Sequence, residues 1–150
     1  NLLDRLFQIE SIIGLKEESY DTTHSSKIVK EFSNRKCIIG AGGGMSRYLR
    51  DYKLGSTAYL AGIANFLPQV ELDFFHNIQN NQFKKAFEIV HEKELPFFET
   101  VISMGWHPSL KEVLELKGLI FSATERRPLE RISNKNREIL RKKLIDNGWL

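Results

Sequence analysis

One lysine of this 150-residue chain lies where an amine can do chemistry. Lys16 follows the apolar run IIGL, which predicts a buried strand over residues 12–16. A lysine amine attacks a ketone carbon only when it is neutral, and an enclosed apolar site favours that form. The protonated imine that results is an electron sink. Lys16 is therefore either a solvated cation at the point where the strand reaches water, or an imine-forming nucleophile.

A glycine-rich stretch, GAGGG at residues 40–44, ends a second predicted strand at residues 37–39. A strand that ends in glycines and enters a helix presents backbone N–H groups and a positive helix end, which suit a carboxylate or a phosphate. The alternative is a loop whose glycines only provide positive φ angles. The dinucleotide fingerprint is missing, because Met45 or Arg47 stands where its third small residue is required, and no P-loop Gly-Lys-Ser/Thr occurs.

Ser46, in the segment GMSRY, raises a second catalytic alternative, a nucleophilic serine on a strand-to-helix turn. The nucleophile elbow requires glycine at the position that Tyr48 occupies. Ser46 as the N-cap of the following helix explains the same residues. We favour the cap and keep the serine hydrolase as an alternative.

The histidines and the single cysteine do not indicate a metal or thiol site. HEKEL at residues 91–95 has leucine where a zinc-binding helix has its second histidine, and the other histidines show no ligand spacing. Cys37 has no partner for an internal disulfide and lies in an apolar run. We therefore expect a buried, inert thiol, a cytoplasmic setting, and neither a metal nor a cofactor.

The elements that position Lys16 alternate between strand and helix. Three alternations within about 80 residues predict an α/β fold with a parallel sheet. Because the carboxyl ends of parallel strands share one edge, Lys16 and the glycine-rich stretch should open on the same side. The expected elements are a helix over 22–32 capped by Thr22 or Thr23, a helix over 46–53, a strand over 58–61, and a helix that begins at Pro68.

From residue 81 onward the pattern is helical. Pro96 should kink or end the first of these helices, and two further helices are expected over 108–116 and 134–147. The first helix carries one apolar face, made of Phe83, Ala86, Phe87 and Val90. Three parallel strands are too few for a self-sufficient sheet, so the chain should be the C-terminal part of a larger α/β fold or pair its edges with another copy.

The net charge of +3 and the pI near 9.0 raise the question of a nucleic-acid partner. The basic excess lies between residues 126 and 143, where eight Lys/Arg accompany two Glu and no aromatic residue is present to stack bases. A solvated helix face explains this pattern better than a phosphate-binding surface. No apolar run approaches the ~18 residues that cross a membrane. We expect neither nucleic acid nor membrane as a partner.

Three segments, in this order, resemble the C-terminal half of the dihydrodipicolinate synthase/N-acetylneuraminate lyase family of (β/α)₈ barrels. IIGLKEES at 12–19 resembles the strand-6 segment, LGSTAYLAGIANFLPQ at 54–69 the strand-8 segment, and ERRPLERISNKNREILRKKLIDNGWL at 125–150 the closing stretch and last helix. The resemblance implies an α/β fold in which residues 1–80 form β/α units 6–8 of a TIM barrel. Residues 81–150 would form a C-terminal helical region that packs on the barrel.

The resemblance also implies a class I (Schiff-base) lyase or aldolase that acts on pyruvate or a related 2-oxo acid as a homo-oligomer, dimer or tetramer, without a cofactor. Lys16 stands where the imine-forming lysine of the family stands. The backbone of matching positions lies near the substrate carboxylate or the imine; these positions are Gly42, Gly43, Gly44 and Leu60. The proton-shuttling tyrosine of the family and its Thr-Thr carboxylate-binding pair belong to the N-terminal half, which precedes these residues.

The glycine-rich stretch departs from the family pattern. Most synthase-type members carry Gly-Asp-Asp or similar there, whereas GAGGGM followed by AYL and NFLP is closer to the 5-dehydro-4-deoxyglucarate dehydratase branch. Two alternatives therefore stand beside the synthase-like lyase. One is such a dehydratase, and the other is a non-catalytic binding or regulatory member that keeps the barrel.

Overall fold

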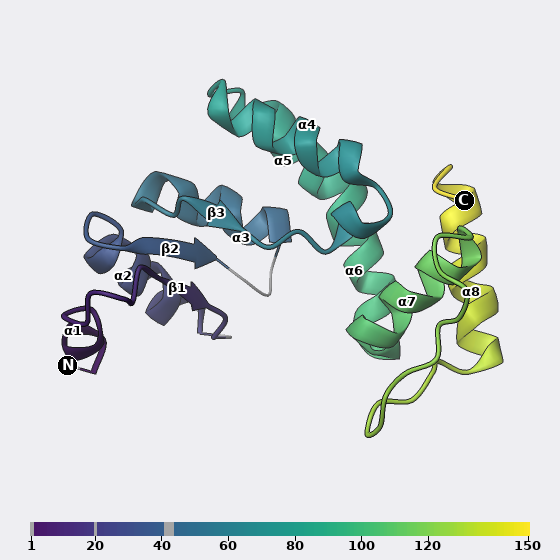
Figure 1. The fold of residues 1–150 in the computed structure, drawn as a ribbon. Helices are drawn as coiled ribbons and strands as arrows, with labels where there is room; N and C mark the ends of the chain where they lie inside the picture. The colour runs from purple at the N-terminus through teal and green to yellow at the C-terminus, as the bar shows by residue number, and fades with distance from the viewer. Residues whose placement is uncertain (1, 20, 41–43) are drawn as a thin grey trace. The chain divides into compact units, whose positions relative to one another are not determined.

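The computed structural model describes residues 2–19, 21–40 and 44–150 (Figure 1). The chain divides into two compact units, unit 1 (Asn1–Ala61) and unit 2 (Gly62–Leu150). Among the described residues, no helix is both long and apolar enough to cross a lipid bilayer.

The described part of unit 1 holds a three-stranded parallel sheet with helices between the strands. The strands lie in the order β1-β2-β3, and Lys16 of β1 pairs with Ile39 of β2. The predicted alternation and the parallel sheet are confirmed. The elements are α1 (Leu2–Leu6), β1 (Gly14–Glu17), α2 (Thr22–Phe32), β2 (Cys37–Gly40), α3 (Gly44–Asp51), the 3₁₀ turn Tyr52–Leu54 and β3 (Ala58–Tyr59).

Both predicted helix caps of unit 1 are wrong. Asp21, not Thr22 or Thr23, caps α2: its backbone is extended and its carboxylate accepts a hydrogen bond from the His24 N–H at 2.9 Å. The helix α3 begins at Gly44, so Ser46 lies inside its first turn instead of at its N-cap. A nucleophile elbow requires its serine on a strand-to-helix turn, and the helical position of Ser46 does not meet that requirement.

Side-chain alternation along the strands separates a helix-covered face of the sheet from an open one. Leu15 and Ile38 point to the covered face, where they join a core that includes Val29 and Phe32 of α2. Cys37 precedes Ile38 and therefore points to the opposite face, where it is exposed and lies 3.1 Å from the Thr57 hydroxyl. The expectation of a buried thiol is wrong, because an apolar run in a strand has only every second residue on the core side.

The described part of unit 2 is helical, as the periodicity predicts. Its core is aromatic: Phe97 is fully buried, and its ring centroid lies 5.0 Å from that of Phe66 and 6.1 Å from that of Trp149. Phe87 is a correction, because 54% of its surface is exposed although it lies on the predicted apolar face. The elements are the 3₁₀ turn Ile63–Asn65, α4 (Pro68–Gln79), α5 (Phe83–Ile89), the π-helical segment Val90–Glu94, α6 (Leu95–Val101), the 3₁₀ turn Ile102–Met104, α7 (Trp106–Leu116) and α8 (Asn134–Asp146).

The alternative in which Pro96 ends the helix is wrong, because Pro96 is the second residue of α6. A proline ring lacks an N–H donor and clashes with the carbonyl four residues earlier, here that of Glu92. The chain widens into a π-helical segment over Val90–Glu94 and resumes as α6 at Leu95. A π-helical turn shifts the carbonyls relative to the ring. The chain therefore remains helical through Pro96.

A buried carboxylate joins α7 to the segment that leads into α8. Glu112 is fully buried and accepts hydrogen bonds from Arg131 at 2.8 and 2.7 Å and another from Arg137. Burial alone raises the pKa of Glu112, but the hydrogen bonds from Arg131 and Arg137 outweigh it, and the pKa lies below the ordinary value. Arg131 and Arg137, two of the eight cations between residues 126 and 143, thus pair with Glu112 inside unit 2.

This network predicts acid-sensitive stability. Because the folded state lowers the pKa of Glu112 from its ordinary value of 4.5, the folded state binds fewer protons than the unfolded state near that pH. The stabilisation is therefore present above about pH 4.5 and is lost as the pH falls through the lowered value. Glu112→Gln should reduce the free energy of unfolding at pH 7 by about 1–3 kcal/mol and flatten its decline in acid.

Urea unfolding at neutral and acidic pH measures both effects, and Glu138→Gln on the exposed side of α8 is the control. A Glu112→Gln protein that loses stability in acid as steeply as the wild type would contradict this assignment of the acid sensitivity.

Candidate active site at the end of β1

The side chain of Lys16 points away from the helices of unit 1. Lys16 is the third residue of β1, between Leu15, which packs on the core, and Glu17, which is buried. Since neighbouring side chains of a strand point to opposite faces, Lys16 lies on the open face with Cys37 and Ile39 of β2. In a closed barrel of parallel strands surrounded by helices, this face is the interior.

Lys16 is accessible and holds one ion pair. Its Nζ donates to Glu18 Oε2 at 2.7 Å, and 46% of the Lys16 side chain and 54% of the Glu18 side chain are exposed. The enclosed apolar site expected from the sequence is not formed by the described residues. An exposed pair of this kind contributes about 0–1 kcal/mol, so a substrate can displace Glu18 at little cost.

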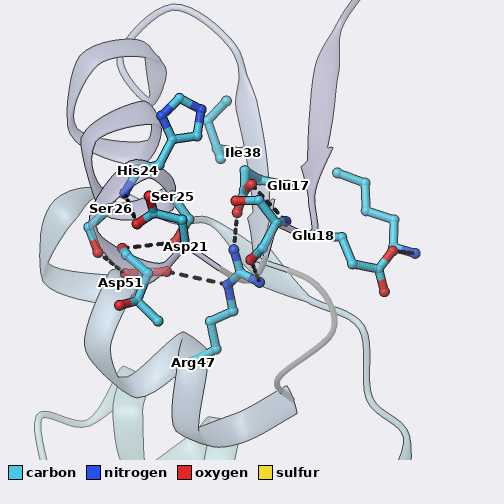
Figure 2. A network of polar contacts seen from close by, with 12 residues as sticks. Glu17, Glu18, Asp21, His24, Ser25, Ser26, Ile38, Arg47 and Asp51 are labelled. Atoms are coloured by element: carbon cyan, nitrogen blue, oxygen red, sulfur yellow. Dashed lines mark hydrogen bonds and ion pairs between the residues drawn. The ribbon is translucent and has the colours of Figure 1, made fainter.

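On the covered face, a buried ion pair between Glu17 and Arg47 joins β1 to α3 (Figure 2). Glu17 is 6% exposed, and one of its carboxylate oxygens accepts a hydrogen bond from Arg47. The other oxygen accepts from the backbone N–H of Ser19 at 2.9 Å. Arg47 also donates to the Ser19 carbonyl at 3.1 Å. The residues directly after Lys16 are thereby held through the side chain of Glu17 and through the backbone of Ser19.

Asp51 extends this network to α2. Its fully buried carboxylate accepts from the Ser26 hydroxyl at 3.0 Å and from Arg50 at 2.7 and 2.6 Å, and it lies 3.9 Å from Arg47 Nε. The hydrogen bond to Asp51 raises the pKa of Arg50. Burial, together with the nearby Arg50, lowers the pKa of Arg47. The carboxylates of Glu17 and Asp51 therefore flank a desolvated guanidinium, as Figure 2 shows.

This network is not among the features predicted from the sequence. Two signals for it are present: Glu17 shares the buried phase of β1 with Leu15, and Arg47 and Asp51 are four residues apart on one helix. A carboxylate on the buried face of a strand requires a cation as its partner, and α3 carries two cations, Arg47 and Arg50. The pairing of Arg47 with Glu17 depends on the parallel crossover, which no local pattern specifies.

The other predicted site residues lie at the same edge of the sheet as Lys16, as far as the structure describes them. Gly44 begins α3 with a φ of 55°, a conformation that favours glycine. Leu60 directly follows β3 and is 51% exposed. Gly42 and Gly43 lie outside the described residues. Within the described ranges, no cluster of three His, Cys, Asp or Glu side chains could hold a metal ion.

Tyr48 is buried between α3 and the sheet. Its ring stacks on that of Tyr59 with centroids 4.8 Å apart and lies 5.6 Å from that of Tyr52. Burial raises the pKa of Tyr48. The ring therefore fastens α3 to β3 on the covered face, whereas Lys16 points to the open face. Tyr48 is a packing residue and not a proton donor to that amine.

Asp51 should stabilise unit 1 measurably. Asp51→Asn removes the charge that compensates Arg50 and Arg47 in a fully buried position, and we expect a loss of about 2–4 kcal/mol in the free energy of unfolding. Asp4→Asn breaks the partly exposed pair with Arg35 and serves as the control, with an expected change below about 0.5 kcal/mol. Denaturant unfolding of the two variants makes the comparison, and equal losses would contradict a structural role for the buried network.

Solved structures with the same arrangement define the class of fold. The chain superimposes on dihydrodipicolinate synthase from Thermotoga maritima with a TM-score of 0.82 and 20% identity, over 96% of this chain and 48% of that one. It superimposes on N-acetylneuraminate lyase from Fusobacterium nucleatum, solved with pyruvate, with a TM-score of 0.80 and 25% identity over 96% of this chain and 47% of that one. The chain therefore has the fold of part of a (β/α)₈ barrel protein.

Sequence comparison identifies the family. The model of the dihydrodipicolinate synthetase family matches residues 1–146, and the chain belongs to this family. A 4-hydroxy-tetrahydrodipicolinate synthase from Buchnera aphidicola is 29% identical over 140 residues, which cover 93% of this chain and 47% of that protein. The corresponding enzyme from Caldicellulosiruptor saccharolyticus is 27% identical over 146 residues, 97% of this chain and 48% of that protein. The chain spans about half the length of these curated relatives, and the lyase class predicted from the sequence is supported at the level of the family.

Proposed function

We propose that this chain provides the imine-forming half of a Schiff-base lyase that acts on pyruvate or a related 2-oxo acid, with Lys16 as the nucleophile. The observation that supports this most directly is the position of Lys16, an accessible amine at the carboxyl end of β1 on the open face of the sheet. In parallel α/β folds this edge carries the active site. In this proposal β1, β2 and β3 are strands 6, 7 and 8 of the barrel.

The proposed reaction begins at the ketone carbon of the 2-oxo acid. The 2-oxo acid displaces Glu18, and the neutral Lys16 Nζ forms a bond to C2. The C2–O bond then breaks, and the oxygen leaves as water with one proton from the amine nitrogen and the proton that the Lys16 ammonium gave up to become neutral, so that a protonated imine remains. That imine accepts the electron pair released when C3 loses a proton. The enamine formed in this way attacks an electrophile, or in the reverse direction stabilises the carbon left by bond cleavage.

The carboxylate of the substrate would be held at the strand edge next to the amine. Gly42, Gly43 and Gly44 precede or begin α3, and the backbone N–H groups of such a segment suit a carboxylate. The backbone at Leu60, directly after β3, would border the imine. The Fusobacterium lyase, which this chain resembles, was solved with pyruvate, which supports a 2-oxo acid as the substrate class.

Proton transfer requires groups from the other half of the barrel. The family places its proton-shuttling tyrosine and its Thr-Thr pair before the strand that carries the lysine. The chain spans about half the length of its curated relatives, and the proposal assigns these groups to the part of the barrel that the chain does not span. General acid–base assistance is worth about 10²–10⁴-fold in rate. Efficient turnover therefore needs both halves, whereas imine formation at Lys16 needs the amine and a bound 2-oxo acid.

A second substrate class, that of the dehydratase branch, has one specific observation in its favour. A probable 5-dehydro-4-deoxyglucarate dehydratase from Arthrobacter is 24% identical over 91 residues, 60% of this chain and 30% of that protein. The glycine-rich segment also agrees better with this branch. Both substrates are 2-oxo acids that would form an imine at Lys16, and they differ in which bond breaks afterwards, C–C in the lyase and C–O in the dehydratase.

Borohydride trapping tests the proposal. In a protein that contains both barrel halves, reduction in the presence of pyruvate should deliver hydride to the imine carbon and leave a stable secondary amine on Lys16. Peptide mass mapping locates this adduct. Lys16→Arg should abolish it, and Lys53→Arg, at an exposed lysine of the same unit, should leave it unchanged.

A panel of substrates separates the alternatives. Trapping by pyruvate favours the lyase, and preferential trapping by 5-dehydro-4-deoxyglucarate favours the dehydratase. A folded protein that yields no adduct at Lys16 with any 2-oxo acid would overturn the catalytic proposal in favour of a binding or regulatory member. The proposed dimer or tetramer is checked on the same preparation by analytical ultracentrifugation, where a monomer at micromolar concentration would contradict it.

A further inference from the structure

The buried pair of Glu17 and Arg47 has no role in the chemistry proposed above. Both side chains are almost completely desolvated, with 6% and 10% of their surface exposed. A buried ion pair contributes little net stability, because a well-packed apolar pair of similar volume often stabilises the folded state as much or more. A pair of this kind is best explained by the residues that it holds in place, and here these are Glu17 and Ser19, which follow Lys16 in the chain.

The Glu17–Arg47 pair holds the chain at the point where the backbone hydrogen bonds of the sheet end. β1 ends at Glu17, so the ladder to β2 stops one residue after Lys16. Beyond that point the chain is held by the Arg47 hydrogen bonds to the Glu17 carboxylate and the Ser19 carbonyl, and by the bond from the Ser19 N–H to Glu17. Asp51 lies 3.9 Å from Arg47 on the next turn of α3 and is itself held by Ser26 and Arg50.

Anchoring Glu17 determines the direction of Lys16. Side chains of a strand alternate between faces, and a slip of one residue would exchange the two faces for every position. β1 is four residues long, so few backbone hydrogen bonds oppose such a slip. With the Glu17 carboxylate held by Arg47 on the covered face, Lys16 has to project from the open face. The register therefore depends on an electrostatic contact as well as on Leu15.

We propose that Arg47 is a positioning residue for Lys16: through Glu17 and Ser19 it sets the face and the angle at which the amine meets the substrate. This inference rests on the proposed imine chemistry and adds a specific residue to it. Arg47 lies in the first turn of α3, three residues after Gly44, the last of the glycines proposed to hold the carboxylate. The same guanidinium thus links the strand that carries the amine to the helix that follows the glycine-rich stretch.

The rate of imine trapping tests this role in a protein that contains both barrel halves. Arg47→Met should lower the first-order trapping rate at saturating pyruvate by about 10- to 100-fold, because a small displacement of a reacting group reduces the reaction rate strongly. The pyruvate concentration that gives half of the maximal rate should change less than about threefold, since the substrate carboxylate is held elsewhere. Arg47→Lys, which keeps one charged donor, should recover part of the rate.

Two variants separate positioning from general stability. Val29→Ala opens a cavity in the core between α2 and the sheet and destabilises unit 1 without touching the network. At a temperature where both variants are fully folded by circular dichroism, Val29→Ala should trap within about twofold of the wild-type rate. Glu17→Gln keeps the shape of the side chain and should slow trapping as Arg47→Met does, which covers the case in which Arg47→Met fails to fold.

The outcomes for the two proposals are distinct. A wild-type protein that forms no adduct at Lys16 overturns the proposed function and this inference with it. A wild-type protein that forms the adduct, with folded Glu17→Gln and Arg47 variants that trap at the same rate, overturns the positioning role alone. Equal slowing by Val29→Ala also overturns it, because the effect would then follow stability and not the buried pair.

Discussion

The ion pair between Glu17 and Arg47 is the constraint on which the arrangement of unit 1 depends. It places a carboxylate at the end of a four-residue strand against the first turns of α3, with both charges removed from water. Breaking such a pair from one side leaves an uncompensated buried charge, at a cost of about 3–5 kcal/mol. The residues that continue the pair, Asp51 with Ser26 and Arg50, bring α2 into the same network. One guanidinium thus fixes the relation of β1 to the two helices that cover it.

This constraint explains how a short strand presents a charged residue on each face. Lys16 and Glu17 are neighbours in sequence, and one is exposed while the other is buried. The buried carboxylate keeps the strand in register, and the exposed amine follows from the alternation. Unit 2 uses the same principle where Glu112 accepts hydrogen bonds from Arg131 and Arg137 and joins α7 to the segment before α8. In both units a buried carboxylate fastens segments that are far apart in the sequence.

The local sequence predicted much of the fold and less of the site. Period-two and period-3.6 patterns located β1, α2 and α8 to within about two residues, because they depend on neighbours in the chain. The errors arose where a non-local contact or a one-residue shift decided the outcome. The apolar run predicts Cys37 in the core, but Cys37 is exposed. Ser46 is predicted to cap α3 but lies inside its first turn. The pairing of Glu17 with Arg47, 30 residues away, depends on the crossover between the parallel strands and is not predicted by the local sequence. Lys16 was identified from its strand-end position and from a family resemblance, whereas the absence of an apolar enclosure among the described residues followed from the structure.

The central claim is that Lys16 forms a covalent bond to a 2-oxo acid while Glu17 and Arg47 hold its strand. The most direct measurement is a crystal structure, with pyruvate, of a protein that contains both barrel halves. The account predicts continuous electron density between Lys16 Nζ and C2 of the substrate, a broken Lys16–Glu18 pair, and an intact pair between Glu17 and Arg47. Pyruvate bound without a covalent link, or linked to a different lysine, would contradict it.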